Sequence, residues 1–259
     1  MSECIDLQFN GGLATLTLAQ PPVNALDRHL VGELADAVAQ VRDSEEARAL
    51  VVTGGPKVFA AGGDVKEMLG WGYRTAVRSS GALGAACDAL AGLPVPVIAA
   101  INGYAFGGGL EVALAADLRV CATDAKLGFP EILLGVIPGA GGTQRLPRLV
   151  GASRAKDLIY SGRTIGAERA LQLGLVDHVA EPDAVLKTAA ELAEPYLRGP
   201  ALALRAAKRA VDRGLETSLE AGLELERELF AGLFATEDRA VGMASFVADG
   251  LGKAEFHGR

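Results

Sequence analysis

Two glutamates lie in apolar surroundings, where a carboxylate is costly unless it has a partner or a function. Glu111 lies on a predicted helix that continues through residues 112–116 with apolar side chains on nearly every face, and Glu131 lies in the otherwise apolar segment 128–135. Burial raises the pKa of a carboxyl group and favours the protonated state that a general acid needs. For Glu111 the competing interpretation is a surface cap, because the helix dipole stabilises an acid in a first turn. The pair predicts acid–base chemistry.

Two glycine-rich turns follow consecutive apolar segments, at residues 59–64 and 102–109. In each, a predicted strand gives way to glycine and then to a helix, so unpaired backbone N–H groups face whatever lies beyond the strand ends. Two converging N–H groups can form an oxyanion hole. The glycines could instead serve only tight turns and close packing. Glu111 favours the functional interpretation, because it follows Gly108 by three residues and lies on the same helical face, about 5–6 Å away.

An alternation of strands and helices must position these groups. The apolar patterns predict strands at 13–18, 49–53, 97–101 and 118–122, weaker strands near 126–129 and 176–179, and helices near 27–42, 74–91 and 107–116. This order predicts an α/β core with parallel pairing.

Beyond residue 200 the sequence predicts helices alone, with apolar residues along one face of 219–234. Thr217 and Glu220 match a capping box that would start this helix, and Thr236 would start the next one. An apolar helical face of this kind packs on the core or on another subunit, so we expect a homo-oligomer.

Composition and charge exclude several classes of function. The formal net charge is −7 and no Lys/Arg cluster is present, so we expect neither nucleic acid nor a membrane surface as a partner. Cys4, Cys87 and Cys121 lack metal-binding spacing, which predicts a reducing compartment and no metal site. The sequence contains no GxxxxGK[ST], G-x-S-x-G or HExxH motif, and its three histidines lie in peripheral segments. Without a signal-peptide or membrane-span pattern, the expected location is the cytoplasm.

The chain resembles the enoyl-CoA hydratase/isomerase, or crotonase, superfamily over essentially its whole length. The resemblance rests on three segments, FAAGGDVKEM at 59–68, INGYAFGGGLE at 101–111 and FPEILLGVIPGAGGTQR at 129–145, and on residues 174–176 and 256–259. It implies an α/β fold with a ClpP-like spiral core of repeated ββα units over residues 1–195. It also implies a C-terminal all-helical oligomerisation region over residues 196–259, assembled as a trimer or a dimer of trimers.

The resemblance further implies an enoyl-CoA hydratase of fatty-acid or related acyl-CoA degradation. The N–H groups of Gly63 and Gly108 would bind the thioester oxygen, and that of Gly139 would orient a water. Glu111 would take the proton of this water and Glu131 would protonate the α-carbon. Because isomerases of the family commonly keep only the later carboxylate, two glutamates favour hydration. The alternatives are an isomerase or another enolate-forming acyl-CoA enzyme, and a non-catalytic acyl-CoA- or RNA-binding relative.

The resemblance also implies how coenzyme A, as part of the substrate and not a separate cofactor, is held. Ala61, Asp64 and Lys66 match positions near its nucleotide end. Phe246 and Lys253 match positions that act from a neighbouring subunit, with an apparent two-residue insertion before Lys253. The preferred acyl chain depends on how certain side chains line the pocket, and ordinary core packing is the competing interpretation for them: Met68, Trp71, Tyr73 and Phe106.

Overall fold

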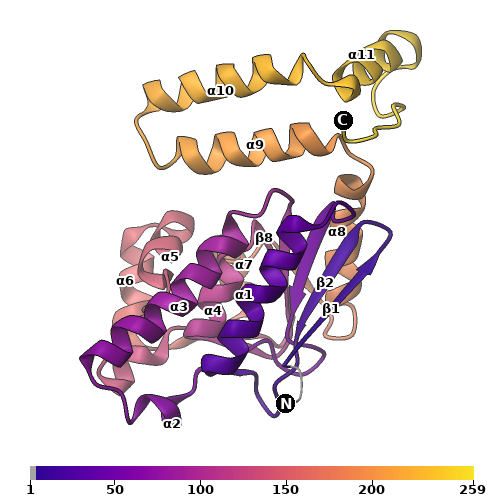
Figure 1. Ribbon diagram of the computed structural model, residues 1–259. Helices are drawn as coiled ribbons and strands as arrows, with labels where there is room; N and C mark the ends of the chain where they lie inside the picture. Colours follow the sequence, from indigo (N-terminus) through magenta and orange to yellow (C-terminus); the bar gives the residue numbers. More distant parts are fainter. Residues whose placement is uncertain (1–3) are drawn as a thin grey trace.

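A six-stranded sheet with the order β1-β2-β4-β6-β8-β11 forms the centre of the core (Figure 1). The computed structural model describes residues 4–259. The strands are β1 (Ile5–Asn10), β2 (Leu13–Leu18), β4 (Ala49–Thr53), β6 (Val97–Ile101), β8 (Leu118–Ala122) and β11 (His178–Ala180). All neighbours are parallel except β1 and β2. The predicted parallel α/β core is confirmed, and β11 begins two residues later than predicted.

Five short strands form two smaller sheets beside the large one. They are β3 (Ala25–Leu26) with β5 (Gly62–Gly63), and β10 (Thr164–Gly166) with β9 (Lys126–Gly128) and β7 (Tyr104–Phe106). Four of them follow a strand of the large sheet and precede a helix, as in β2-β3-α1, β4-β5-α2 and β6-β7-α4, whereas β10 lies between α6 and α7. This succession is the repeated ββα unit that the family resemblance implies, and it brings the glycine-rich turns to one side of the large sheet.

Helices cover the large sheet on both faces. α8 (Val185–Leu197) packs on β4, β6 and β8, whereas α1 (Arg28–Asp43) packs on β1 and β2 and against α3 (Tyr73–Ala91). Every residue of β4 and β6 is therefore buried. The remaining core helices are α2 (Val65–Met68), α4 (Gly108–Leu114), the 3₁₀ helix η1 (Pro130–Leu134), α5 (Gly142–Val150), α6 (Ala152–Ser161) and α7 (Ala167–Leu173). The predicted helix at 107–116 is thus shorter than expected.

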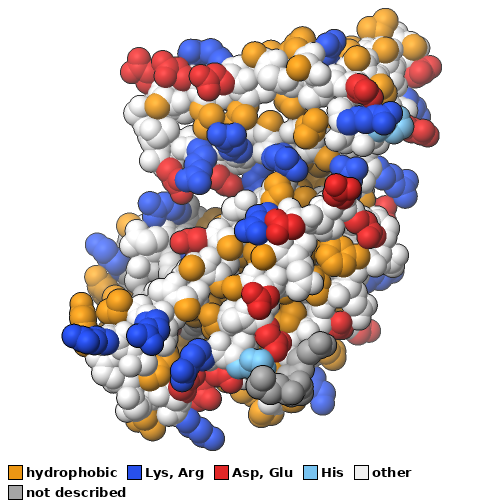
Figure 2. Space-filling view, in the orientation of Figure 1, with side chains coloured by type: hydrophobic (Ala, Val, Ile, Leu, Met, Phe, Trp, Pro, Cys, Tyr) orange, Lys and Arg blue, Asp and Glu red, His pale blue; other side chains and the backbone are white. Residues whose placement is uncertain are grey.

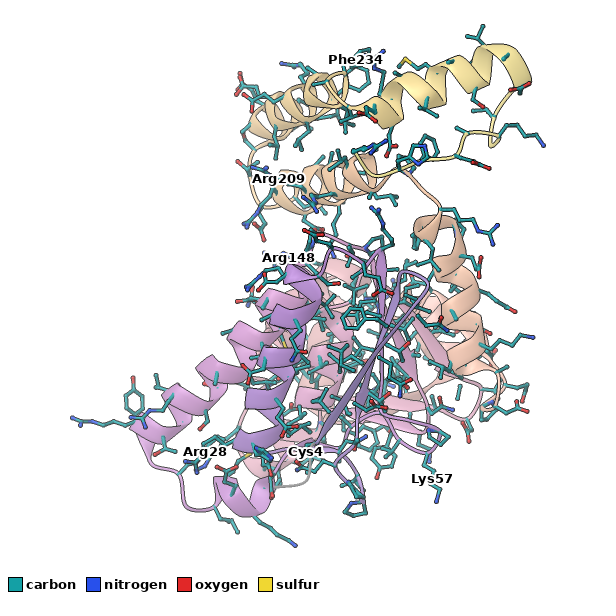
Figure 3. All side chains as sticks on the ribbon, turned by 45° about the vertical axis from the view of Figure 1, so that its right-hand side comes forward. Cys4, Arg28, Lys57, Arg148, Arg209 and Phe234 are labelled. Carbon is teal, nitrogen blue, oxygen red and sulfur yellow. The ribbon has the colours of Figure 1, made fainter. Side chains whose placement is uncertain are left out.

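Three C-terminal helices form a separate layer above the core: α9 (Ala201–Gly214), α10 (Leu219–Leu233) and α11 (Glu237–Asp249) (Figure 1). Within α9 and α10 no residue is buried. Lys and Arg side chains gather along the boundary with the core (Figure 2), and Lys208 Nζ lies 2.8 Å from Asp117 Oδ2. Figure 3 shows Arg209 on α9 and Phe234 just beyond α10.

The caps of the C-terminal helices correct one prediction. The capping hydroxyl of α10 belongs to Ser218, which accepts a hydrogen bond from the Ala221 N–H, and not to Thr217. Two adjacent hydroxyl residues precede the helix, and the second one has the extended backbone that a cap requires. Thr236 caps α11 as predicted.

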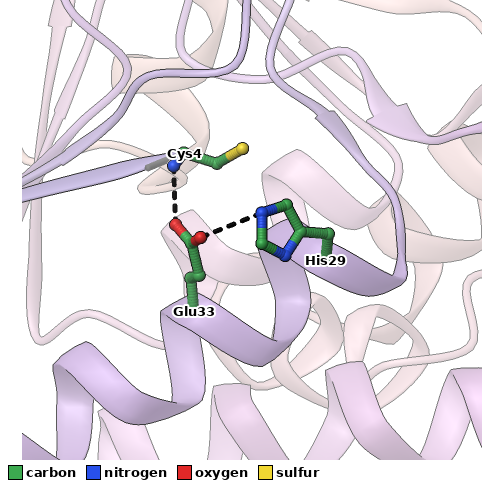
Figure 4. Close-up of side chains that lie close together, drawn as sticks. All are labelled: Cys4, His29 and Glu33. Atoms are coloured by element: carbon green, nitrogen blue, oxygen red, sulfur yellow. Dashed lines mark hydrogen bonds and ion pairs between the residues drawn. The ribbon is translucent and has the colours of Figure 1, made fainter. Parts of the chain in front are cut away.

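Glu33 ties the beginning of β1 to α1 (Figure 4). Its Oε2 accepts hydrogen bonds from the N–H groups of Cys4 at 2.6 Å and Ile5 at 3.0 Å, and its Oε1 lies 3.0 Å from His29 Nε2. Cysteine, histidine and glutamate are all potential metal ligands. Because protein donors engage both carboxylate oxygens, we interpret the group as a structural link between β1 and α1.

Across residues 4–259, none of the helices has both the length and the apolar composition that crossing a membrane requires.

Candidate active site

A cavity of about 770 Å³ lies between α1, α3, the glycine-rich turns and η1. Six of the residues singled out in the sequence line it: Ala61, Gly63, Gly108, Glu111, Glu131 and Gly139. Met68, Trp71 and Tyr73 also line it, whereas Phe106 lies outside and stacks on Tyr104 with ring centroids 4.9 Å apart. The cavity therefore combines apolar walls with three acidic residues, Asp27, Glu111 and Glu131, and with the ends of two glycine-rich turns, as is typical of small-molecule sites.

The two glycine-rich turns touch each other at the cavity. Gly62 has a positive φ of 97°, and a Cβ at this position would lie 2.8 Å from the Phe106 carbonyl oxygen and 3.5 Å from the Gly108 nitrogen. Only glycine permits this conformation and this approach. A Cβ built on Gly108 would lie 3.7 Å from the Gly63 nitrogen. The backbone nitrogens of Gly63 and Gly108 are thus brought to the same wall, where Gly108 is the first residue of α4.

Glu111 is buried on α4, with 2% of its surface exposed. Its Oε1 accepts hydrogen bonds from the N–H groups of Ala140 at 2.7 Å and Gly142 at 2.8 Å. Burial raises the pKa of Glu111, and the N–H groups of Gly142, Ala140 and Gly139 oppose this rise because they stabilise the carboxylate. The positive charge of Arg145 acts in the same direction. Glu111 is thus a buried carboxyl group whose ionised form is supported by backbone donors.

Glu131 lies in the first turn of η1 with a different environment. Its Oε2 is buried and has no hydrogen-bond partner among residues 4–259. Burial raises the pKa of Glu131 to about 7, its own backbone N–H opposes the rise, and the nearby charge of Glu111 adds to it. Gly107, whose φ is 51°, gives the carboxyl group room, since a Cβ there would lie 2.7 Å from Glu131 Oε1. With a pKa raised to about 7, the Glu131 carboxyl group can be protonated or ionised near neutral pH.

The predicted coenzyme A contacts are divided between the cavity and other places. Ala61 lines the cavity, and its N–H donates to the Val23 carbonyl at 3.0 Å. Asp64 caps α2 by accepting a hydrogen bond from the Lys66 N–H at 2.8 Å, and the side chain of Lys66 is exposed on this helix. Phe246 on α11 and Lys253 beyond it belong to the C-terminal layer and do not line the cavity of their own chain (Figure 1).

Sequence reasoning did not single out several groups at the site. Ala140 and Gly142 donate to Glu111 through backbone N–H groups, which have no residue-type signature. Arg28 lines the cavity with an exposed side chain (Figure 3) and lies 3.0 Å from Glu67. A basic residue at the start of the helix predicted near 27–42 is a weak signal that could have found it.

Comparison with known proteins shows the family to which the chain is similar. The sequence model of the enoyl-CoA hydratase/isomerase family matches residues 8–258. The chain is similar to a crotonyl-CoA hydratase from Syntrophomonas wolfei, with 40% identity over 248 residues and 95% of each chain covered. Its fold is similar to the crystal structure of an enoyl-CoA hydratase from Bacillus anthracis, with a TM-score of 0.94, 36% identity, and coverage of 99% of this chain and 100% of the other.

Proposed function

The chain belongs to the enoyl-CoA hydratase/isomerase family, and we propose that it is an enoyl-CoA hydratase, which adds water across the 2,3 double bond of a trans-2-enoyl-CoA to give a 3-hydroxyacyl-CoA. The observation that carries this proposal is that two glutamates line one cavity. Glu111 is buried and accepts backbone N–H groups that support its ionised form, and Glu131 is half-buried with a pKa raised to about 7. Such a pair supplies a base and an acid to one substrate.

The proposed reaction uses the wall formed by the two glycine-rich turns. The N–H groups of Gly63 and Gly108 donate to the thioester carbonyl oxygen, which gains negative charge as the β-carbon is attacked; one such donor contributes about 3–4 kcal/mol in other enzymes. Glu111 takes a proton from a water that Gly139 helps to orient, and the oxygen of this water bonds to the β-carbon. The resulting enolate then takes a proton from Glu131 at the α-carbon. The hydrogen and the hydroxyl group are added to the same face of the double bond.

We place coenzyme A at the mouth of the cavity, beside the exposed cations Arg28 and Lys66. The neighbouring-subunit contacts of Phe246 and Lys253 need a second copy of the chain. The exposed large apolar residues within 196–259 supply a surface for it: Val211, Leu215, Leu219, Leu223, Phe230, Phe234, Met243, Phe246, Val247 and Leu251. We therefore propose a homotrimer or a dimer of trimers in the cytoplasm. The reaction as written uses only carboxyl and backbone groups, and coenzyme A enters as part of the substrate.

The test is the ultraviolet absorbance of the conjugated thioester. Purified protein is expected to remove this absorbance from a trans-2-enoyl-CoA, because hydration destroys the conjugation. An isomerase would instead create absorbance from a 3-enoyl-CoA, and a binding relative would change neither substrate. Turnover that survives unchanged in both Glu111→Gln and Glu131→Gln would contradict the mechanism. Light scattering of the eluting protein gives the oligomeric state.

A further inference from the structure

Arg145 covers the loop that holds Glu111 but lies outside the residues that line the large cavity. It belongs to the first turn of α5, and its side chain is 21% exposed. Its Nη1 donates to the Ala140 carbonyl oxygen at 3.1 Å, and its Nη2 lies 2.6 Å from Asp88 Oδ1 on α3. The planar guanidinium group therefore bridges α3, α5 and the loop between η1 and α5, which a point-like ammonium group cannot do with the same geometry.

The N–H and the carbonyl group of Ala140 are both hydrogen-bonded to side chains. Its N–H donates to Glu111 Oε1, and its carbonyl accepts from Arg145. Because the two groups belong to successive peptide planes, the two hydrogen bonds fix the orientation of Ala140 within the loop. The next residue, Gly141, has a φ of 113°, and a Cβ there would collide with Arg145 Nη1. Glycine at position 141 thus lets the guanidinium group lie directly against the loop.

The charge of Arg145 acts on Glu111 as well. A guanidinium group stays protonated across the physiological pH range, so it favours the ionised form of a nearby carboxyl group. At Glu111 this charge lowers the pKa in the same direction as the N–H groups of Gly142 and Ala140, against the effect of burial. The position of the Arg145 side chain therefore affects Glu111 in two ways, through the hydrogen bonds of the loop and through its own positive charge.

We propose that Arg145 is a positioning residue, which orients the loop 139–142 so that its N–H groups remain on Glu111 and Glu111 remains available as a base. The role of Glu111 as a base rests on the proposed hydratase function, whereas the effect of Arg145 on the carboxyl group does not. Asp88, whose side chain is 77% exposed, contributes mainly by fixing the orientation of the guanidinium group, because an exposed ion pair adds little stability.

The experiment compares Arg145→Gln and Arg145→Lys with Arg148→Gln. Arg148 lies on the same helix, is exposed, and donates to the Gln144 carbonyl at 2.9 Å, so its replacement removes the same charge without touching the loop. Carboxyl ¹³C NMR of glutamate-labelled protein, with Glu111→Gln to assign the signal, gives the pKa of Glu111 without any substrate. Steady-state hydration against pH gives kcat and KM.

Arg145→Gln is expected to raise the pKa of Glu111 by about one pH unit. The acid limb of the rate profile should move to higher pH by the same amount, because the base must be ionised. kcat should fall about 10- to 100-fold while KM stays within about twofold, since Arg145 does not touch the substrate. Arg145→Lys should restore most of the pKa and only part of kcat, and Arg148→Gln should stay within about twofold of the wild type.

A Glu111 pKa in Arg145→Gln equal to that of the wild type overturns the proposal, whatever the rates are. If that variant does not fold, Arg145→Lys decides: a lowered kcat with a near-wild-type pKa supports the proposal, and a wild-type kcat overturns it. If the wild type itself hydrates no enoyl-CoA, the proposed function fails, while the NMR titration still decides the effect of Arg145 on Glu111.

Discussion

The two regions that hold the glutamates surround the carboxyl group with different numbers of hydrogen-bond donors. The region of Glu111, formed by α4 and the loop 139–142, is buried and provides two backbone N–H groups to one oxygen. The region of Glu131, formed by η1, lies at the edge of the fold, where Leu133 and Leu134 are exposed, and leaves one buried oxygen without a partner among the described residues. Desolvation raises the pKa at both sites, whereas backbone donors from a loop distant in sequence act only on Glu111.

This difference shows how one cavity can hold an acid and a base of the same residue type. Donors to a carboxylate stabilise its charge and oppose the effect of desolvation. The loop donors and Arg145 oppose the rise of the Glu111 pKa, whereas only its own backbone N–H opposes the rise of the Glu131 pKa to about 7. Glu111 lies on a buried helix of the core. Glu131 lies on the 3₁₀ helix η1, and its carboxyl group lies against Gly107. We therefore expect replacement of the Glu111 carboxyl group to leave the backbone around it in place. At the η1 site, few contacts other than those of Glu131 itself define the geometry.

The largest effect is expected for Glu131→Gln, with a loss of about 10⁴ in kcat. An amide cannot give a proton to the α-carbon, and the buried Oε2 of Glu131 has no hydrogen-bond partner among residues 4–259 that the amide could preserve. Steady-state hydration of a short enoyl-CoA measures the loss. A residual rate within tenfold of the wild type would mean that another group supplies the proton.

A smaller loss, about 10³ in kcat, is expected for Glu111→Gln. The amide oxygen of glutamine can still accept the Ala140 and Gly142 N–H groups, so the loop keeps its place and only the proton acceptor disappears. The same assay, together with substrate affinity measured by quenching of Trp71 fluorescence, separates lost chemistry from lost binding. A greater loss at position 111 than at position 131 would reverse the comparison.

The hydration rate should depend on pH through the Glu131 carboxyl group. The pKa of Glu131 is raised to about 7, and its protonated form is the acid of the proposed mechanism. The rate should therefore approach a tenfold fall per pH unit above that value, or about 50-fold between pH 7 and pH 9. The rate profile of the wild type tests this, and the residual activity of Glu131→Gln should lack the limb. A profile that stays flat to pH 9 would place the acid elsewhere.

Much of the fold and part of this comparison could be predicted from the sequence. The apolar runs of β4 and β6 and the alternation of β2 gave clear strand patterns, and the spacing of Gly108 and Glu111 placed a carboxyl group one helical turn from a glycine-rich turn. The strand β1 was missed, although Ile5, Leu7 and Phe9 alternate before the turn at residues 11–12. Local periodicity was sufficient wherever burial follows the period of the element.

The difference between the glutamates could not be predicted, because it arises from contacts distant in sequence. The N–H groups that bind Glu111 come from a loop about thirty residues later, and a backbone donor carries no residue-type signal. Arg145 is only a basic residue in a helical pattern until the fold places it over Ala140. Likewise, the space that Gly107 leaves for Glu131 requires the register between β7 and β9.

An effect of about tenfold on kcat is expected for Gly107→Ala. The new Cβ would lie 2.7 Å from Glu131 Oε1, so the carboxyl group must move although its chemistry is unchanged. Gly174→Ala is the matched control: Gly174 has a similar positive φ of 73°, with open space around it, at the end of α7. Equal kcat losses in the two variants would mean that backbone strain alone, and not displacement of Glu131, lowers the rate.

The smallest effect concerns stability. A carboxyl group whose pKa is raised on folding binds its proton more tightly in the folded state, so its contribution to stability is lost as the pH rises through about 7. At pH 8 the wild type must hold an ionised, poorly solvated Glu131, and glutamine does not. Glu131→Gln should therefore raise the free energy of unfolding by about 1 kcal/mol at pH 8, with little change at pH 5, as measured by urea denaturation.

Glu191→Gln, at an exposed position on α8, controls for the loss of one negative charge and should show no such pH dependence. Glu111→Gln should stabilise the protein less than Glu131→Gln at pH 8, because the backbone donors offset part of the effect of burial on the Glu111 carboxylate. If both site variants gain equal stability at pH 8, burial alone governs the two carboxyl groups and the donors of the loop have no energetic role. If only Glu131→Gln gains, the η1 region retains an ionisable group at the expense of stability, as expected where function and stability conflict.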